Sequence, residues 1–234
     1  MSLLVARGLT RLYAPGAGVE EVDLEVGEGE VLGIIGPNGG GKSTLLLLLA
    51  GLVEPTKGSV TVEGVPAHEL ARRGAGKVGL ITATYGLYPL LSGWENLVFF
   101  AGLFGLSEDE VHQRADALLA DLGMTEHLGR RVSTYSSGMQ QKLSLTRALL
   151  MDPVLLLLDE PTANLDPVSA RNIYTLLRAR AARGLAVVLV THDLHTAEHV
   201  CDRVVAIRGR ITGERSFPGL REPPSPPLLE LYGE

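Results

Sequence analysis

The stretch "EVLGIIGPNGGGKSTLLLLLAGLV", residues 30–53, decides the fold. Its apolar run Val31–Ile35 predicts a buried strand, and the run from Lys42 to Val53 predicts a helix. The loop between them, Gly36–Thr44, matches the pattern G-x-x-x-x-G-K-[ST]. Glycines let this backbone turn tightly, so that successive N–H groups and the helix N-terminus face phosphate oxygens. Because a strand and a helix flank the loop, we expect a phosphate-binding loop rather than a flexible glycine turn.

The loop residues have separate expected tasks. Lys42 would reach the β and γ phosphates of a nucleotide and take part in catalysis, and the Ser43 hydroxyl would ligate Mg²⁺. The nucleotide would be surrounded by every residue of the loop: Gly36, Pro37, Asn38, Gly39, Gly40, Gly41, Lys42, Ser43 and Thr44.

A second apolar strand, "VLLLLDEP" at Val154–Pro161, ends in two adjacent carboxylates. We expect this strand to end beside the loop, which would bring Asp159 to the Mg²⁺ held by Ser43. Glu160 would then orient and deprotonate a water molecule for attack on the γ phosphate. One carboxylate alone would suggest only a turn at the end of a strand, whereas both together, downstream of the loop, favour a hydrolytic site.

The sequence "THDL", Thr191–Leu194, follows the apolar run "AVVLV" and places His192 at the same predicted sheet edge as Glu160. A neutral imidazole there would hydrogen-bond the γ phosphate and contribute to catalysis. A lone histidine after a strand is usually incidental, so this prediction depends on the neighbouring carboxylates. The other histidines lack such a context and are expected to be surface or packing residues.

The sequence "YSSGMQQK", Tyr135–Lys142, predicts the start of a helix. Ser137 and Gln140 have the S-x-x-Q spacing of a capping box, which accounts for Ser137 structurally. Capping does not explain the serine pair and Gly138, which would expose hydroxyls and N–H groups at a positive helix end suited to phosphate. Taken alone, this signal is weak.

Composition and charge restrict the class of protein. The chain has 234 residues, 45% hydrophobic and 21% charged, as in a globular protein with one large domain or two small ones. A net charge of −6 disfavours nucleic acid as a partner, because duplex binding relies on basic patches. The single cysteine, Cys201, cannot form an intrachain disulfide and is expected in the core. We expect neither a signal peptide nor a membrane-spanning helix, since the longest apolar run, Leu45–Val53, is too short.

Alternating strands and helices indicate an α/β domain with a mostly parallel sheet. Strands are expected in the runs "EVDLEV", "EVLGIIG", "GSVTVEG", "KVGLIT", "VLLLLD", "AVVLVTH" and "RVVAIR". Helices are expected between them at Lys42–Val53, Ala170–Arg183 and Leu194–Val200. From about Trp94 to Met151 only helical spacing occurs, which predicts a helical subdomain inserted into the core. The expected single domain has a core of about 1–83 and 152–216, a helical subdomain of about 84–151 and a proline-rich tail at 217–234.

The glycine-rich loop, "YSSGMQQK", "LLLLDEP", "NLDP" and "VTHD", in this order, resemble the nucleotide-binding subunit of ATP-binding cassette (ABC) transporters. The resemblance spans nearly the whole chain and is strongest to exporter-type (ABC-2-like) proteins. It implies a P-loop NTPase core with a mostly parallel sheet, a small antiparallel β portion at the N-terminal side and an inserted helical subdomain. It also implies a Mg²⁺-dependent ATPase at the cytoplasmic face of the cell membrane, powering a permease in a separate chain.

The resemblance assigns further site residues. Tyr13 falls where the family has an aromatic residue that stacks on adenine. Three residues fall in the family signature, which implies contact with the ATP held by a second copy in a head-to-tail dimer: Ser136, Ser137 and Gly138. Asp166 would lie across the dimer seam, and the following Pro167 also predicts that Asp166 is a helix N-cap.

Two positions depart from the family pattern. Ser137 stands where the signature has a glycine, so its hydroxyl is either tolerated or alters closure of the dimer. Ala83 stands where the family has a glutamine that reaches Mg²⁺ and the membrane subunit, and alanine has no side-chain donor or acceptor. Either water completes the metal's coordination or Thr82 or Thr84 substitutes.

The aromatic segment "YGLYPLLSGWENLVFF" has two interpretations. In the family this face receives a short helix from the membrane subunit. Otherwise Tyr85, Tyr88 and Trp94 simply pack the helical subdomain. For the whole chain, the alternative to a transporter subunit is a soluble ABC-type assembly or regulatory ATPase, which has no use for this surface. A small-molecule kinase would need an acceptor-binding lid that the sequence does not indicate.

Overall fold

The computed structural model describes residues 2–74, 76–82, 84–163 and 165–217. The strands are β1 (Ser2–Ala14), β2 (Ala17–Gly27), β3 (Val31–Ile35), β4 (Lys57–Val62), β5 (Val65–Pro66), β6 (Val78–Ile81), β7 (Leu155–Asp159), β8 (Ala186–Val190), β9 (Arg203–Arg208) and β10 (Arg210–Ser216). The helices are α1 (Lys42–Leu49), α2 (Ala67–Arg73), α3 (Gly93–Leu103), α4 (Glu108–Asp121), α5 (Ser137–Leu149), α6 (Pro167–Ala181) and α7 (Leu194–Val200), with 3₁₀ turns η1 (Thr125–His127) and η2 (Val132–Thr134).

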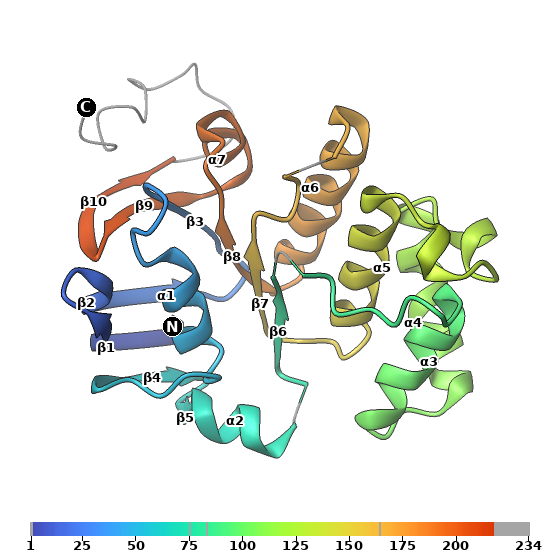
Figure 1. The fold of residues 1–234 in the computed structure, drawn as a ribbon, viewed down its shortest axis with the longest axis horizontal. Coiled ribbons are helices and arrows are strands. Elements are labelled where there is room, and N and C mark those ends of the chain that lie inside the picture. Colours follow the sequence, from blue (N-terminus) through green and yellow to red (C-terminus); the bar gives the residue numbers. More distant parts are fainter. Residues whose placement is uncertain (1, 75, 83, 164, 218–234) are drawn as a thin grey trace.

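The strands form two sheets (Figure 1). The antiparallel sheet has the order β2-β1-β4-β5, and the large sheet has the order β10-β9-β3-β8-β7-β6. In the large sheet β9, β3, β8, β7 and β6 pair in parallel, and β10 pairs antiparallel to β9. The predicted α/β class, the mostly parallel sheet and the small antiparallel portion are confirmed.

Strand β7 shows why its run of leucines is apolar throughout. Leu156 and Leu158 belong to the core that includes residues of α3–α6, whereas Leu155 and Leu157 belong to the core shared with α1 and the antiparallel sheet. Successive side chains of a strand point to opposite faces, and both faces of this sheet are covered. Cys201 is also buried, as predicted, and burial raises the pKa of its thiol to about 12.

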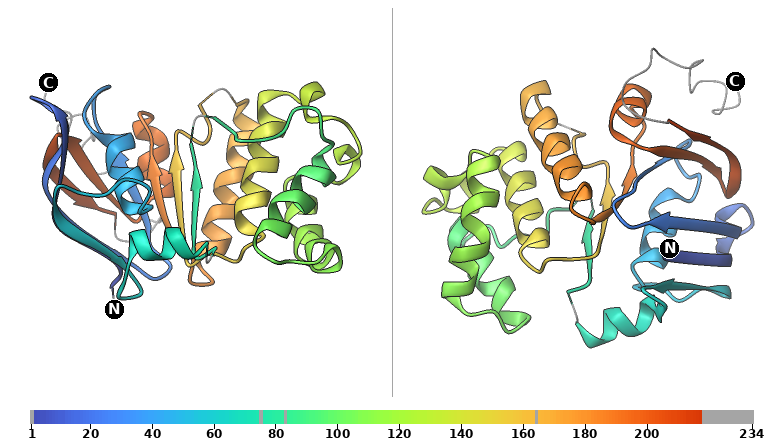
Figure 2. Two further views of the ribbon diagram at one scale, coloured as in Figure 1. Left: turned by 60° about the horizontal axis from the view of Figure 1, so that its bottom comes forward. Right: turned by 180° about the vertical axis from the view of Figure 1, so that it is seen from behind.

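Helices α3, α4 and α5 occupy the stretch between β6 and β7, as the helical spacing predicted. Figure 2 shows them on the far side of the large sheet from the antiparallel sheet. Ser92 with Glu95 and Ser107 with Glu110 form capping boxes at the starts of α3 and α4. Across the described parts of the chain, none of the helices has the length and apolar character needed to span a membrane.

Some elements differ from the predictions. Helix α1 ends at Leu49 rather than Val53, because Gly51 has a φ of 70° and a Cβ atom there would lie 2.3 Å from the Ala67 backbone. Helix α6 begins at Pro167, before the expected Ala170. Elements β1, β5, β10 and α2 were not predicted. Strand β1 lacks a regular alternation of apolar and polar residues, because the register of its pairing with β2 shifts at several points.

Candidate active site

The carboxyl ends of three neighbouring parallel strands, β3, β8 and β7, meet at one edge of the large sheet. The loop Gly36–Thr44 follows β3, and Thr191 and His192 follow β8. Asp159 is the last residue of β7, and Glu160 comes next. Ligand sites of open α/β sheets lie at this edge. Strand β8 lies between β7 and β3. The loop nevertheless contacts Asp159, through Ser43 in the first turn of α1.

The loop backbone is held in a tight turn. Gly41 has a φ of 94°, and a Cβ atom there would lie 2.4 Å from the Gly18 carbonyl oxygen, so only glycine fits. The Lys42 side chain is buried, and its Nζ donates to the carbonyl oxygens of Gly36 and Pro37 at 2.8 and 3.0 Å. An ammonium group fixed at a helix N-terminus presents positive charge to an anion.

Two oxygen ligands suited to Mg²⁺ lie side by side. The Ser43 hydroxyl donates to Asp159 Oδ2 at 2.8 Å. Mg²⁺ prefers oxygen ligands, keeps several waters and usually takes one or two carboxylates together with substrate phosphates. Within the described residues, no cluster of three or more His, Cys, Asp or Glu side chains is placed to hold a metal by itself. Ser43 and Asp159 therefore fit an ion that is shared with a nucleotide.

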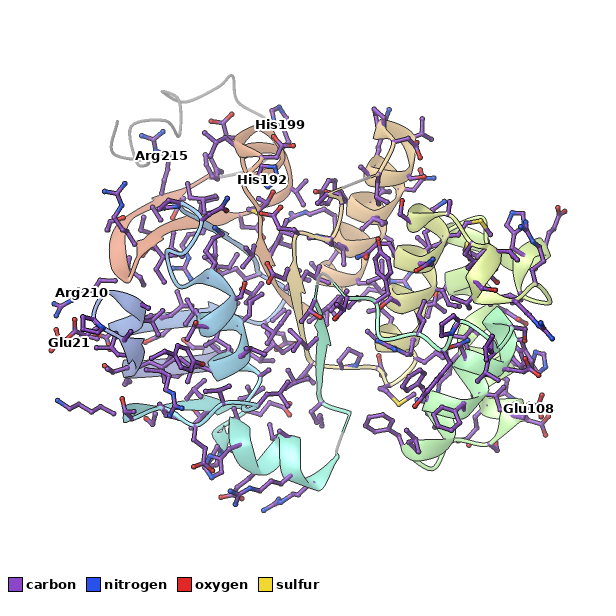
Figure 3. The ribbon with its side chains drawn as sticks, in the orientation of Figure 1. Glu21, Glu108, His192, His199, Arg210 and Arg215 are labelled. Atoms are coloured by element: carbon purple, nitrogen blue, oxygen red, sulfur yellow. The ribbon has the colours of Figure 1, made fainter. Side chains whose placement is uncertain are left out.

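Glu160 is constrained by both its backbone and its side chain. Its φ is 50°, which is uncommon for a residue other than glycine, and its N–H donates to Val190 O at 3.0 Å. Its Oε2 lies 2.9 Å from Nδ1 of His192. His192 is the more exposed partner and lies where β8 leads into α7 (Figure 3). The structure thus joins the two side chains that were predicted from the sequence to take part in catalysis.

A cavity of about 380 Å³, termed the loop cavity, opens at this edge. It is lined by Asn38, Gly39 and residues 41–44 of the loop, by Tyr13, and by the carboxylates Asp159 and Glu160. Tyr13 is 56% exposed, with the Arg11 guanidinium 5.3 Å from the centre of its ring. An exposed aromatic ring beside a phosphate loop offers a stacking surface for a nucleotide base.

The predicted signature residues lie elsewhere in the chain. Ser136, Ser137 and Gly138, at the start of α5, are absent from the lining of the loop cavity. Helices α1 and α5 pack on opposite faces of the large sheet (Figure 1). Within one chain, the structure therefore does not bring these residues to the loop.

The start of α5 differs from the predicted capping box by one residue. Ser136, rather than Ser137, is the N-cap, and its side-chain oxygen accepts from Met139 N at 3.3 Å. Ser136 has extended backbone, with a ψ of 162°, whereas Ser137 is already the first helical residue. Gln140 Nε2 donates to the Tyr135 carbonyl oxygen at 3.3 Å. The prediction was wrong because spacing alone does not determine which of two adjacent serines takes the extended conformation.

Helix α6 begins with Asp166 as its N-cap and Pro167 at the first position, as predicted. Asp166 Oδ1 accepts from the N–H groups of Ser169 and Val168 at 2.9 and 3.0 Å. Hydrogen bonds with Ser169, and then with Val168, hold the pKa of the Asp166 carboxyl below its usual value. Capping is thus accounted for within one chain, and contact of Asp166 with a second chain stays a prediction.

A smaller cavity of about 60 Å³, termed the carboxylate cavity, shares Asp159 and Glu160 with the loop cavity. It is also lined by Thr82, which follows β6, and by Gln141 of α5. Ala83 lies outside the described residues. The sequence pointed to Thr82 but not to Gln141, because the cavity is assembled from three segments that are distant in the sequence.

An apolar groove of about 390 Å³, termed the aromatic groove, is lined by Phe100, Phe104, Met151 and Arg147 among others. The Arg147 guanidinium lies 4.4 Å from the centre of the Phe100 ring, and burial lowers its pKa. Tyr88 is 48% exposed and stacks on Phe100, with ring centres 5.5 Å apart. An exposed aromatic face beside an apolar groove is typical of an interaction surface.

Three aromatic residues of the segment that follows β6, Tyr85, Tyr88 and Trp94, lie in different environments. Trp94 packs within the helical segment: its ring centre lies 3.9 Å from that of His112, and its Nε1 donates to Glu108 Oε1 at 3.0 Å. The carbonyl oxygen of Tyr85 accepts from Ser144 of α5 at 3.2 Å. Of the three, Tyr88 alone stacks on a ring that lines the aromatic groove.

The fold and the site define a phosphate-loop α/β protein with a carboxylate pair at the end of a second parallel strand of the same sheet. Residues 19–163 match the family described as ABC transporter, and the chain belongs to that family.

The chain is 36% identical over 231 residues to the uncharacterized ABC transporter ATP-binding protein YdbJ of Bacillus subtilis (strain 168), covering 98% of this chain and 74% of that protein. It is 41% identical over 209 residues to a fluoroquinolones export ATP-binding protein of Mycobacterium tuberculosis (strain CDC 1551 / Oshkosh), covering 88% of this chain and 68% of that protein. A solved dimeric ATP-binding cassette in a post-hydrolysis state, bound to ADP and Pi, matches with a TM-score of 0.82 at 29% identity, over 94% of this chain and 99% of that chain.

Proposed function

We propose that this chain binds and hydrolyses ATP with Mg²⁺ as the ATP-binding subunit of an ABC exporter. The observation that carries the proposal is the contact between Ser43 of the loop and Asp159, at 2.8 Å, beside the paired Glu160 and His192. Membership of the ABC transporter family and a relative named for export support it.

In this proposal, ATP occupies the loop cavity. Lys42 exchanges its two carbonyl contacts for the β and γ phosphates, because a charged pair is stronger than a bond to a neutral carbonyl. Ser43 and Asp159 hold Mg²⁺, which supplies charge neutralisation at these phosphates when bound. Tyr13 stacks on the adenine.

Glu160 is the proposed base for hydrolysis. Its carboxylate accepts a proton from a water molecule as the water oxygen bonds to the γ phosphorus and ADP leaves. His192 turns from Glu160 Oε2, now 2.9 Å away, toward the γ phosphate. These roles need both side chains at one sheet edge, which is where β7 and β8 end.

Two copies close head to tail around two ATP molecules in this proposal. Ser136 and Ser137 are exposed at the N-terminus of α5, away from their own loop cavity. A helix N-terminus with free approach suits the phosphates of ATP held by a second copy. Gly138 would let the second chain approach closely, and Asp166 would lie at the seam. The solved dimer bound to ADP and Pi supports this arrangement.

The aromatic groove receives a short helix from a separate permease, which holds the chain at the cytoplasmic face of the membrane. Apolar lining, exposed Phe104 and the exposed ring of Tyr88 favour an amphipathic helix as the occupant.

The test is a pull-down of tagged Glu160→Gln protein with Mg-ATP from detergent-solubilised membranes of its host. The substitution keeps the size of the side chain and removes the base, so we expect ATP binding, almost no turnover and a co-purified multi-span membrane protein. Glu126→Gln, on the exposed turn η1, is the matched control and should turn over ATP normally. Ordinary turnover by Glu160→Gln would contradict the assignment of the base, and only soluble partners would favour an assembly ATPase.

A further inference from the structure

The carboxylate cavity contains a buried amide that the proposed function does not use. Gln141 is 4% exposed and lines this cavity together with Thr82, Asp159 and Glu160. Among the fully buried side-chain nitrogen and oxygen atoms of the described residues, Arg11 Nε alone lacks a hydrogen-bond partner, so the Gln141 amide is not an unsatisfied buried group. An amide that lines a small cavity can hydrogen-bond a water molecule inside that cavity.

The neighbouring polar groups on the same face of α5 are already engaged. Ser144 and Arg147 follow Gln141 at three-residue spacing, which places them along one helix face. Ser144 Oγ donates to Tyr85 O at 3.2 Å, and Arg147 Nη1 donates to Gly86 O. These two residues fasten the segment after β6 to α5, whereas Gln141 faces the cavity.

The carboxylate cavity is suited to water. Its volume of about 60 Å³ exceeds the roughly 10–15 Å³ that one water molecule requires. A buried water also needs two to four polar partners, and the residues that line the cavity include Gln141, Thr82, Asp159 and Glu160, all with polar side chains. The amide can donate to the water or accept from it, so it can position a water whose own hydrogen points at a carboxylate.

We propose that Gln141 is a positioning residue for hydrolysis, holding a water molecule against the Glu160 carboxylate. Glu160 lines both the carboxylate cavity and the loop cavity. The carboxylate that contacts this water therefore also borders the cavity in which ATP is proposed to bind. In the reaction the water oxygen bonds to the γ phosphorus and the bond from that phosphorus to the β–γ bridging oxygen breaks. ADP leaves with the electron pair of the broken bond, and Glu160 receives the proton. The inference rests on the proposed ATPase function and extends it to a residue of α5.

The test compares Gln141→Met with wild type in the full chain. Methionine has the same length and fills the same volume, but it cannot hold the water. We expect kcat to fall about tenfold to a hundredfold, because loss of positioning acts on the reacting geometry. The dissociation constant for Mg-ATP and the Tm of the nucleotide-free chain should stay unchanged, since methionine fills the space of the glutamine side chain. Gln141→Asn keeps the amide and should retain more of the kcat than Gln141→Met.

Thr146→Val is the control, because Thr146 is a fully buried polar residue of the same helix that does not line the carboxylate cavity. Its hydroxyl donates to Lys142 O at 2.9 Å, and the variant should have wild-type kcat. A wild-type kcat in Gln141→Met would overturn the inference, as would a fall in Tm and ATP affinity that accounts for its lost activity. If the wild-type chain hydrolyses no ATP, the proposed function itself fails, which is a separate outcome.

Discussion

Asp166 combines two roles, one as a helix cap within its own chain and one proposed at the seam with a second chain. The cap is visible as two hydrogen bonds from the first turn of α6. Comparing a substitution that removes the cap with one that keeps it therefore separates the contribution of Asp166 to the stability of one chain from its proposed contribution to the nucleotide-dependent association of two chains.

We predict that Asp166→Ala lowers the Tm of the nucleotide-free chain at pH 7 by roughly 2–4 °C. Asp166→Asn keeps an N-cap and should stay close to wild type. Because hydrogen bonds lower the folded-state pKa of Asp166, its ionised cap stabilises the fold above the unfolded pKa of about 3.9 and loses this effect as pH falls through the folded value. The Tm difference between wild type and Asp166→Ala, measured by calorimetry, should shrink below about pH 4. A difference that is constant with pH would contradict ionic capping.

At the scale of residues, the side chains that belong to a contiguous sequence motif could be predicted from the sequence. Lys42 and Ser43 follow from the glycine loop, and Asp159 with Glu160 follows from the end of an apolar strand. Gln141 was missed because its significance depends on a cavity built from β6, β7 and α5. Periodicity of α5 shows which residues share a face, but only the tertiary packing shows what that face meets.

At the scale of elements, the aromatic groove and the active site are separable surfaces. Phe104 lines the groove and is 46% exposed, and it contributes nothing to the lining of the loop cavity. A change there should therefore affect a docked helix without affecting ATP.

We predict that Phe104→Asp abolishes co-purification of the permease while the isolated chain keeps wild-type ATP turnover. A carboxylate placed in an apolar groove loses its hydration when a helix docks and has no compensating partner there. Leu52→Asp is the control, because Leu52 is an exposed apolar residue, 61% accessible, that does not line the groove. Permease recovered in wild-type amounts with Phe104→Asp would show that docking occurs elsewhere.

The elements themselves were predicted where periodicity was strong. Helices α3, α4, α5 and α7 and the buried parallel strands followed from apolar spacing, whereas the exposed edge strand β10, with its alternating exposed and half-buried residues, did not. The end of α1 was misplaced because the apolar run continues past Gly51, and the close approach of the Ala67 backbone that requires glycine there is a tertiary contact.

At the scale of the whole molecule, one sheet organises the site. The phosphate loop, the carboxylates and His192 follow its parallel strands and therefore lie at one edge of the sheet. Helix α5 packs on the opposite face of the sheet from α1. The signature residues are therefore displayed away from their own loop, an arrangement that a second chain would complete. The order of strands was not predictable from the sequence, because β8 lies between β3 and β7 although it follows both in the chain.

The most direct test of the ATP-sandwiched dimer is the molar mass of Glu160→Gln in solution, measured by light scattering with and without Mg-ATP. We predict that Mg-ATP produces a species of two chains. The double variant Glu160→Gln with Ser136→Glu should not form it, because a carboxylate at the start of α5 repels the γ phosphate of the opposing ATP. A single-chain mass with ATP bound, or the same ATP-dependent dimer in the double variant, would contradict the account.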